Sequence, residues 1–272
     1  PMAEQRLPPI LLVGCGKMGG AMLTGWLKRG LAPSVVVEPH AAALAGFAGQ
    51  VTGVADAAAI DPAFRPAAVV LAIKPQEAAA ALPAFARFVG PETVFISIMA
   101  GRAISGMRGL LGEGARVIRA MPNTPAAIGQ GFTVACPGPG VSEAQRALAD
   151  ALLAAVGEVA WVEQEGLIDP VTAVSGGGPA YVFLLAEVME AAAIAEGLPA
   201  DLARRMARAT VAGSGALLGA SAEDAATLRR AVTSPKGTTE RALAVLMEQP
   251  AWPDLMRQAI AAATARSREL AG

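Results

Sequence analysis

The stretch Ile10-Leu11-Leu12-Val13-Gly14-Cys15-Gly16-Lys17-Met18-Gly19 decides the fold of this chain. Its four leading apolar residues predict a short buried strand, and the pattern over residues 18–29 predicts a helix. A glycine-rich turn alone is weak evidence, but G-x-G-x-x-G between a strand and a helix indicates dinucleotide binding. Gly14 permits the tight turn, Gly16 lets the backbone approach a pyrophosphate, and Gly19 allows close packing of the helix. We therefore expect an α/β, Rossmann-like N-terminal domain that binds NADPH or NADH at the start of this helix.

Further apolar runs predict the other strands of an open sheet. They lie at residues 35–37, 51–54, 67–73, 93–98, 116–120, 131–136 and 158–162. Pro75 is expected to begin a helix that runs to residue 88 and is bent or divided at Pro83. Asp56 is expected to open a short helix, and Ser142-Glu143-Ala144-Gln145 predicts a capping box at the start of another.

Glu38 ends the second predicted strand, where a dinucleotide-binding fold places the acid that binds the adenosine ribose. On this interpretation Glu38 binds the cofactor and favours NADH over NADPH. Two alternatives stay open. An acid at a strand end is often simply solvated, and His40 or a backbone turn could accept a 2′-phosphate. His40 itself is expected on the surface at the start of a helix.

The carboxyl ends of three predicted strands carry small or polar residues, and ligands bind along that edge of an open parallel sheet. These are the glycine-rich turn, Lys74-Pro75, and Ser97 with Met99-Ala100-Gly101. We expect them to surround the nicotinamide half of the cofactor. Asn123 lies between two prolines in a rigid polar loop after the next strand, and is expected to contact the substrate or the nicotinamide.

Strand signals stop after residue 165, and the remainder is helical in pattern. We therefore expect a dinucleotide-binding domain at 8–164 and an all-helical domain at 165–272. The helix predicted at 179–196 is apolar on nearly every side, but Glu187 and Glu190 make a membrane span costly. We interpret it as a buried helix of a soluble protein whose missing partner is another subunit. The alternative is a self-contained helical bundle.

Composition narrows the function classes. The chain has 272 residues, and 22 basic against 23 acidic residues give a net charge of −1, which provides no electrostatic footprint for nucleic acid or a membrane surface. Cys15 and Cys136 are isolated, which favours a reducing, cytoplasmic location, and no secretory signal is recognised. His40 is the only histidine, so Ser-His-Asp catalysis is excluded and no metal site is expected.

The polar loop at residues 232–239, Val-Thr-Ser-Pro-Lys-Gly-Thr-Thr, lies between two helical segments. Pro235 fixes one φ angle, and Gly237 is expected to supply a positive φ. Hydroxyls and free N–H groups at the start of the next helix would suit a carboxylate or phosphate. The alternative is that Thr238 or Thr239 simply caps that helix.

Taken in order, four motifs resemble those of pyrroline-5-carboxylate reductases over essentially the whole chain. They are the glycine-rich signature, Met121-Pro122-Asn123-Thr124-Pro125, Ser175-Gly176-Gly177-Gly178-Pro179-Ala180-Tyr181, and the 232–239 loop, which is the most specific. The resemblance implies reduction of L-Δ¹-pyrroline-5-carboxylate to L-proline with NADPH or NADH. It also implies a Rossmann domain, a helical C-terminal dimerisation domain and a homodimer, and family members often build dimers into larger rings.

The resemblance also assigns residues to the site. The cofactor would be bound by Gly14, Gly16, Lys17, Met18, Gly19, Ala72, Lys74, Pro75, Ser97, Met99, Ala100 and Gly101, with Glu38 from the argument above. The substrate would be bound by Asn123 and by backbone N–H groups of Ser234, Gly237 and Thr238. The hydroxyl of Thr239 would lie near the ring nitrogen, as the catalytic contact. The resemblance implies that the 234–239 loop comes from the neighbouring subunit.

Two positions depart from the family pattern. Lys236 stands where the family usually has glycine, and Gly177 stands where serine is common. Two other functions are alternatives. A β-hydroxyacid dehydrogenase would use a lysine on the helix after the second glycine-rich motif, and residues 179–196 contain none. A non-catalytic dinucleotide-binding scaffold is separable from an enzyme only by assay.

Overall fold

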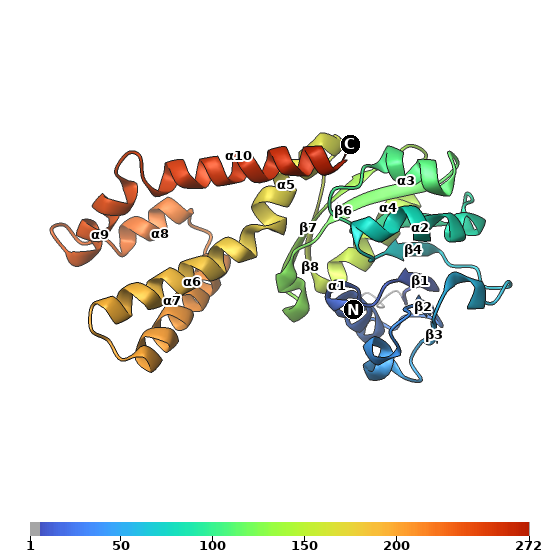
Figure 1. Ribbon diagram of the computed structural model, residues 1–272, viewed down its shortest axis with the longest axis horizontal. Coiled ribbons are helices and arrows are strands. Elements are labelled where there is room, and N and C mark those ends of the chain that lie inside the picture. The colour runs from blue at the N-terminus through green and yellow to red at the C-terminus, as the bar shows by residue number, and fades with distance from the viewer. Residues whose placement is uncertain (1–5, 272) are drawn as a thin grey trace. The chain divides into compact units, whose positions relative to one another are not determined.

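The computed structural model describes residues 6–271. The chain separates into two compact units, shown in Figure 1. The first contains the residues up to Gly176 together with those from Ala263 onward, and the second runs from Gly177 to Ala262. The domain limits expected from the sequence, 8–164 and 165–272, stay a prediction.

A single mixed sheet forms the centre of the first unit. In the described residues it has 8 strands in the order β3-β2-β1-β4-β5-β6-β7-β8. The strands are β1 (Ile10–Val13), β2 (Val35–Val37), β3 (Thr52–Val54), β4 (Ala68–Leu71), β5 (Val94–Ser97), β6 (Arg116–Met121), β7 (Gly131–Pro137) and β8 (Gly157–Trp161). Each predicted strand is confirmed within a few residues. The order reverses between β1 and β4, which is where an open α/β sheet forms its ligand crevice.

The sheet is parallel except between β6 and β7, which pair antiparallel with Arg119 opposite Cys136. This exception was not expected from the sequence. The short connection from Met121 to Gly131 contains only a 3₁₀ turn, Thr124–Ile128. A parallel crossover needs about a dozen residues or more, usually including a helix, so a short connection favours reversal of the chain.

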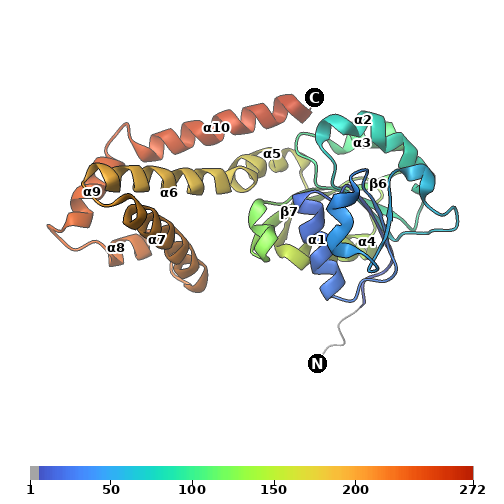
Figure 2. The same cartoon turned by 60° about the horizontal axis from the view of Figure 1, so that its bottom comes forward.

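Helices cover both faces of the sheet, and each face has its own apolar core. On one face, α1 (Lys17–Lys28) and α4 (Glu143–Leu153) pack Met22, Trp26 and Leu152 against β1 and β4. Figure 2 shows these two helices side by side. On the other face lie α2 (Ala78–Ala81), the 3₁₀ segment Leu82–Phe88, α3 (Ile104–Leu111) and α5 (Ile168–Val171).

Local sequence signals explain several element ends. The helix expected from Pro75 is divided into Pro75–Glu77, α2 and Leu82–Phe88, as the proline at position 83 predicts. Asp56 caps the 3₁₀ turn Ala57–Ala59. The capping box at Ser142 is confirmed, because its hydroxyl accepts the Gln145 N–H while the Gln145 side chain accepts the Ser142 N–H.

The second unit is helical. It contains α6 (Gly178–Ala195), α7 (Ala200–Ala220), α8 (Ala225–Ala231), α9 (Thr238–Met247) and the start of α10 (Trp252–Ala271). Helices α6 and α7 lie side by side as a hairpin (Figure 1). The last part of α10 belongs to the first unit.

In the single chain none of the residues of α6 is buried, which disfavours a self-contained bundle, and its burial against another subunit stays a prediction. Val182, Phe183, Leu184 and Val188 are 47–67% exposed, so the described residues of the chain leave about half of this apolar surface uncovered. By length and composition, one helical stretch among the described residues, Glu165–Ala195, could cross a membrane, and a single such stretch is weak evidence for a span.

Candidate cofactor and substrate site

The turn after β1 brings the ends of β1 and β4 into contact. Gly14 has a φ of +90°, and a Cβ atom on it would lie 2.6 Å from the carbonyl oxygen of Ala72. The backbone N–H of Ala72 donates to Val13 O at 2.8 Å, and the N–H of Gly14 donates to Val37 O at 2.9 Å. Only glycine fits at position 14, and the predicted cofactor residues Gly14 and Ala72 therefore lie together at the crevice.

The start of α1 has the features of a phosphate-binding helix end. Gly16 is its N-cap without a side-chain hydrogen bond, and no acidic residue lies in the first turn. A Cβ on Gly16 would meet nothing within 4 Å, whereas one on Gly19 would lie 2.5 Å from Gly14 O. Gly19 therefore allows close packing, and Gly16 leaves open space before the helix. This arrangement fits a pyrophosphate, because a helix N-terminus without a side-chain cap offers N–H donors and a favourable dipole.

Glu38 follows β2 and points its carboxylate at the glycine-rich turn. Oε2 accepts the backbone N–H of Cys15 at 2.8 Å, and Oε1 accepts the backbone N–H of His40 at 2.9 Å. Oε1 also lies 3.0 Å from Nδ1 of the His40 ring. Burial raises the pKa of Glu38, but these hydrogen bonds and the His40 ring outweigh it, so the net pKa is lowered. Glu38 is thus an anion tied to the turn rather than a freely solvated strand-end acid. His40 is on the surface as expected, with its side chain 86% exposed.

The other predicted edge turns divide into exposed and buried members. Lys74 and Ala100 are exposed, whereas Ser97 and Met99 are buried. The Ser97 hydroxyl accepts the N–H of Met99 at 3.2 Å, so this side chain shapes the turn from within. Gly101 has a φ of +62°, a conformation that favours glycine.

Arg102 links two of these turns, and sequence reasoning gave it no role. Its Nε and Nη2 donate to the carbonyl oxygen of Pro75 at 2.9 and 2.6 Å. The connection after β5 is therefore tied to the connection after β4. Nothing in the local pattern around Arg102 could reveal this partner, which lies 27 residues away along the chain.

Asn123 uses both ends of its side-chain amide within the first unit. Oδ1 accepts the N–H of Phe132 at 2.9 Å, and Nδ2 donates to the Ser175 hydroxyl at 3.2 Å. Ser175 lies in a single π-helical turn, Thr172–Gly176, at the second glycine-rich motif. Asn123 therefore pins its loop to β7 and to this turn, and Ser175 joins the candidate site as its partner.

The 232–239 loop lies in the second unit and corrects two expectations. Gly237 does not supply the positive φ: its φ is −82°, while Lys236 has a φ of 62°. Thr238 and Thr239 do not cap the helix, because Gly237 is the N-cap of α9 and no side-chain cap is formed. The carboxylate of Glu240 instead turns back and accepts the N–H of Lys236 at 2.7 Å.

The geometry of this loop leaves its polar groups outward. Gly237 N–H donates to Ser234 O at 3.0 Å, which closes the turn. Ser234, Thr238 and Thr239 are exposed. A helix start with exposed hydroxyls and no side-chain cap can bind an anionic group of a ligand. The predicted cofactor residues thus belong to the first unit, as does Asn123, and the other predicted substrate residues belong to the second.

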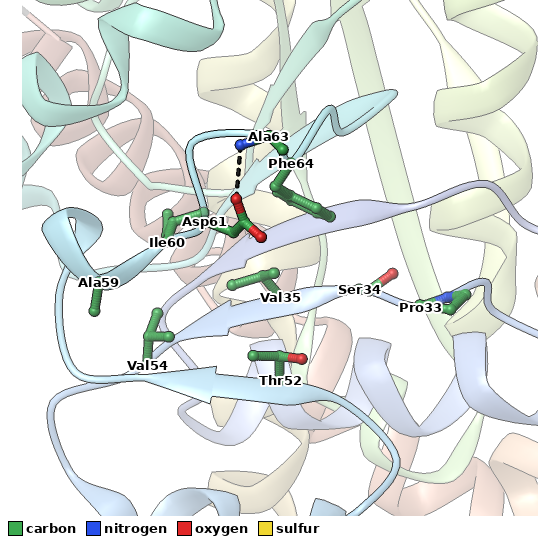
Figure 3. Close-up of a pocket in the computed structure, with 10 residues that line it drawn as sticks. All are labelled: Pro33, Ser34, Val35, Thr52, Val54, Ala59, Ile60, Asp61, Ala63 and Phe64. Atoms are coloured by element: carbon green, nitrogen blue, oxygen red, sulfur yellow. Dashed lines mark hydrogen bonds between the residues drawn. The ribbon is translucent and has the colours of Figure 1, made fainter.

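Among residues 6–271, no group of three or more His, Cys, Asp or Glu side chains could hold a metal ion. A pocket of about 340 Å³ is formed by β2, β3 and the 59–64 segment (Figure 3). Figure 3 shows the Asp61 carboxylate turned back to the N–H of Ala63, at 2.8 Å. None of the residues predicted to bind cofactor or substrate lines this pocket.

Two family models match the chain. One is described as pyrroline-5-carboxylate reductase dimerisation and matches residues 165–270. The other is described as NADP oxidoreductase, coenzyme F420-dependent, and matches residues 9–101. The first covers the helical region and the second covers the glycine-rich turn and the first five strands.

Similar proteins extend over nearly the full length. Pyrroline-5-carboxylate reductase of Pseudomonas aeruginosa is 37% identical over 266 residues, covering 97% of each chain. That of Mycobacterium tuberculosis is 35% identical over 285 residues, covering 96% of each chain. The solved structure of the reductase from Coxiella burnetii has a TM-score of 0.88 at 31% identity and covers 97% of this chain and 98% of its own. A Plasmodium falciparum pyrroline carboxylate reductase, solved with NADP bound, shares the fold with a TM-score of 0.82 at 23% identity, covering 97% of this chain and 98% of its own.

Proposed function

The chain belongs to the pyrroline-5-carboxylate reductase family, and from this premise we propose that it reduces L-Δ¹-pyrroline-5-carboxylate to L-proline. The carbon of the C=N bond accepts a hydride from NADPH or NADH, and its nitrogen is protonated before the transfer, so that the product is the amine; this is the last step of proline biosynthesis. The observation that carries the proposal is similarity running through both units, from the glycine-rich turn to the 232–239 loop. Absence of lysine from α6 disfavours the β-hydroxyacid dehydrogenase alternative.

The first unit supplies the cofactor site in this proposal. Backbone groups of Gly14, Gly16, Lys17, Met18 and Gly19 hold the pyrophosphate at the start of α1. The turns at Ala72-Ile73-Lys74-Pro75 and at 97–101 flank the nicotinamide half. When bound, the dihydronicotinamide supplies the hydride. The chain's own residues align the two ligands and exclude water, which can supply a large part of the rate enhancement for such a transfer.

Glu38 sets the cofactor preference in this proposal. Its carboxylate is anionic and faces the glycine-rich turn, where the adenosine ribose of a dinucleotide lies in this fold. A carboxylate accepts hydrogen bonds from ribose hydroxyls, whereas it repels a 2′-phosphate. We therefore propose that NADH is accepted at least as well as NADPH.

The second unit supplies the substrate contacts. Backbone N–H groups of Ser234, Gly237 and Thr238 bind the substrate carboxylate, and Thr239 Oγ1 hydrogen-bonds the ring nitrogen. The exposed turn and the helix start without a side-chain cap support this assignment. A threonine hydroxyl is a weak acid, so Thr239 positions the C=N bond rather than acting as a strong proton donor. Asn123 contributes to substrate binding by fixing its own loop, because its side chain accepts the N–H of Phe132.

A homodimer completes the proposed enzyme. The exposed apolar surface of α6 and the match of residues 165–270 to a dimerisation model support it. As in the family resemblance, the 234–239 loop of one subunit would serve the cofactor site of its partner, and dimers would build larger rings. A net charge of −1 and two isolated cysteines support a cytoplasmic enzyme that associates with neither nucleic acid nor a membrane.

A spectrophotometric assay tests the function. Purified protein mixed with pyrroline-5-carboxylate and NADH or NADPH should lose absorbance at the dihydronicotinamide band and form proline. Omission of pyrroline-5-carboxylate is the control. Clear cofactor binding with no turnover of this substrate would refute the reductase and favour the non-catalytic scaffold.

The dimer has its own test. Phe183→Glu places a charge on the apolar surface of α6, where the wild-type side chain is 67% exposed in the single chain. Light scattering after size-exclusion chromatography should show the wild type as a dimer or a multiple of dimers and the variant as a smaller species. Lys28→Gln, on exposed α1 surface, should leave the assembly intact. A monomeric wild type would contradict the proposal.

A further inference from the structure

The last turn of α10 packs against the turn that follows β5. A Cβ atom on Gly101 would lie 2.7 Å from the Cβ of Leu270, so the two residues are in close contact and a larger residue at 101 would collide with Leu270. Gly101 is buried and belongs to the turn predicted to flank the nicotinamide half. The C-terminal turn of the chain is therefore a neighbour of the candidate cofactor site.

The same turn of α10 makes a second, polar contact. The hydroxyl of Ser267 donates to Oδ1 of Asp169 at 2.7 Å, and both residues are buried. Nη2 of Arg119 lies 3.4 Å from the same oxygen. Arg119 is only 2% exposed in the middle of β6, so its charge depends on these partners.

Arg119 is also linked to the segment that follows the Gly101 turn. Its Nη1 donates to Oε1 of Glu165 at 3.2 Å, and this oxygen also accepts the backbone N–H of Ile104 at 2.7 Å. Ile104 is the first residue of α3, the helix that begins after the Gly101 turn. The last turn of α10 therefore contacts the connection between β5 and α3 in two ways. Leu270 packs directly against Gly101. Ser267 reaches Ile104 indirectly, through the polar contacts of Asp169, Arg119 and Glu165.

We propose that the last turn of α10 is a positioning element of the cofactor site, with Leu270 and Ser267 as its positioning residues. Both hold the 99–104 connection in the conformation that receives the nicotinamide half of the dinucleotide. The adenosine half, bound at α1 and Glu38, does not depend on this turn. The proposal rests on the use of NAD(P)H in the proposed function.

If the last turn of α10 only stabilised the fold, its variants would behave differently. Loss of general stability would lower the thermal midpoint and, where part of the protein is unfolded, weaken binding of every ligand equally. Loss of position would weaken only ligands that carry nicotinamide. ADP-ribose separates the two cases, because it contains the adenosine and pyrophosphate groups of NADH and lacks the nicotinamide ring.

Leu270→Ala and Ser267→Ala in the full-length protein provide the test, with Ser267→Thr as the variant that keeps the hydroxyl. Arg268→Ala, an exposed position in the same turn, is the matched control. Dissociation constants for NADH are measured by dihydronicotinamide fluorescence, and those for ADP-ribose by calorimetry. We expect Kd for NADH to rise about 3- to 10-fold in both alanine variants, the effect of one lost contact. Kd for ADP-ribose should stay within about twofold of wild type on the same scale.

Ser267→Thr and Arg268→Ala should bind NADH like the wild type. An unchanged Kd for NADH in both alanine variants, or an equal rise for ADP-ribose, would overturn the proposal. Leu270 is 53% exposed, so we expect the Leu270→Ala variant to fold. If Ser267→Ala does not fold, Leu270→Ala alone provides the test. Binding is measured without turnover. A protein that binds NADH but does not reduce pyrroline-5-carboxylate would therefore refute the proposed reaction. The positioning role of the α10 turn would still be tested by the dissociation constants alone.

Discussion

The carboxylate of Glu38 accepts the backbone N–H of Cys15 at 2.8 Å, which joins the end of β2 to the glycine-rich turn after β1. In the proposed enzyme this side chain therefore has two roles: its charge selects the cofactor, and its hydrogen bond stabilises the turn proposed to bind the pyrophosphate. The two roles can be separated, because glutamine keeps an acceptor oxygen and removes the charge, while alanine removes both.

Glu38→Gln should raise the ratio of kcat/KM for NADPH to that for NADH by about 10-fold. The substitution removes the repulsion between the carboxylate and the 2′-phosphate, which is worth roughly 1.4 kcal/mol. Turnover with NADH should fall only modestly, because the amide oxygen can still accept the Cys15 N–H. Glu38→Ala should shift the same ratio and also weaken both cofactors. Steady-state kinetics with each cofactor measure this, and an unchanged preference in both variants would remove Glu38 from cofactor selection.

The lowered pKa of Glu38 predicts an acid-dependent contribution to stability. A carboxyl whose pKa is lower in the folded protein stabilises it above the unfolded pKa of about 4.3, and this contribution is lost as the pH falls through the folded value. The free energy of unfolding should therefore differ more between wild type and Glu38→Gln at pH 6 than at pH 3. Urea titrations at one protein concentration measure the difference. A gap that does not narrow in acid would contradict the prediction.

Thr239→Ala should lower kcat/KM for pyrroline-5-carboxylate by about 10- to 1,000-fold, the range of one lost transition-state hydrogen bond. The thermal midpoint should hardly change, because α9 has no side-chain cap for the substitution to remove. Thr239→Ser keeps the hydroxyl and should retain most activity. If the alanine variant reacts as fast as the serine variant, the hydroxyl plays no part in positioning the substrate.

Lys236→Gly should stabilise the folded protein by up to about 1 kcal/mol, because a non-glycine residue pays a steric cost at positive φ. The higher entropy of glycine in the unfolded chain offsets part of this gain. The hydrogen bond from the backbone N–H to Glu240 can remain. Thermal unfolding measures the change, and a clear loss of stability would show that the Lys236 side chain makes stabilising contacts.

The charge of Lys236 is tested separately by Lys236→Asn, since asparagine tolerates positive φ. An exposed cation beside a carboxylate contributes at most about 1 kcal/mol, so the substrate KM should rise by less than about fivefold. A larger rise would place the ammonium group in direct contact with the substrate.

Much of the first unit could be predicted from local sequence. The strand ending at Val13 and the glycine-rich turn were expected where the structure has them, and the helix expected at 18–29 is found at Lys17–Lys28. The division of the Pro75 helix and the capping box at Ser142 were expected too. Strand periodicity, turn residues and caps depend on neighbours within a few positions, so the sequence carries them directly.

Partners distant in sequence were decided by the tertiary structure. The bond from Arg102 to Pro75 and the chain of contacts from Ser267 to Ile104 join residues that no local pattern relates. The antiparallel pairing of β7 also depends on a folded connection rather than on the strand's own pattern.

The helix α6 and the 232–239 loop show most clearly which properties the sequence determines and which depend on the tertiary structure. The sequence by itself determined that α6 is apolar on nearly every side and that the loop contains hydroxyls at the start of a helix. Only the tertiary structure decided that α6 stays exposed in one chain, and that Lys236 rather than Gly237 takes the positive φ. The physical reason is that composition sets which groups are available, whereas burial and backbone conformation depend on what the folded chain places against them.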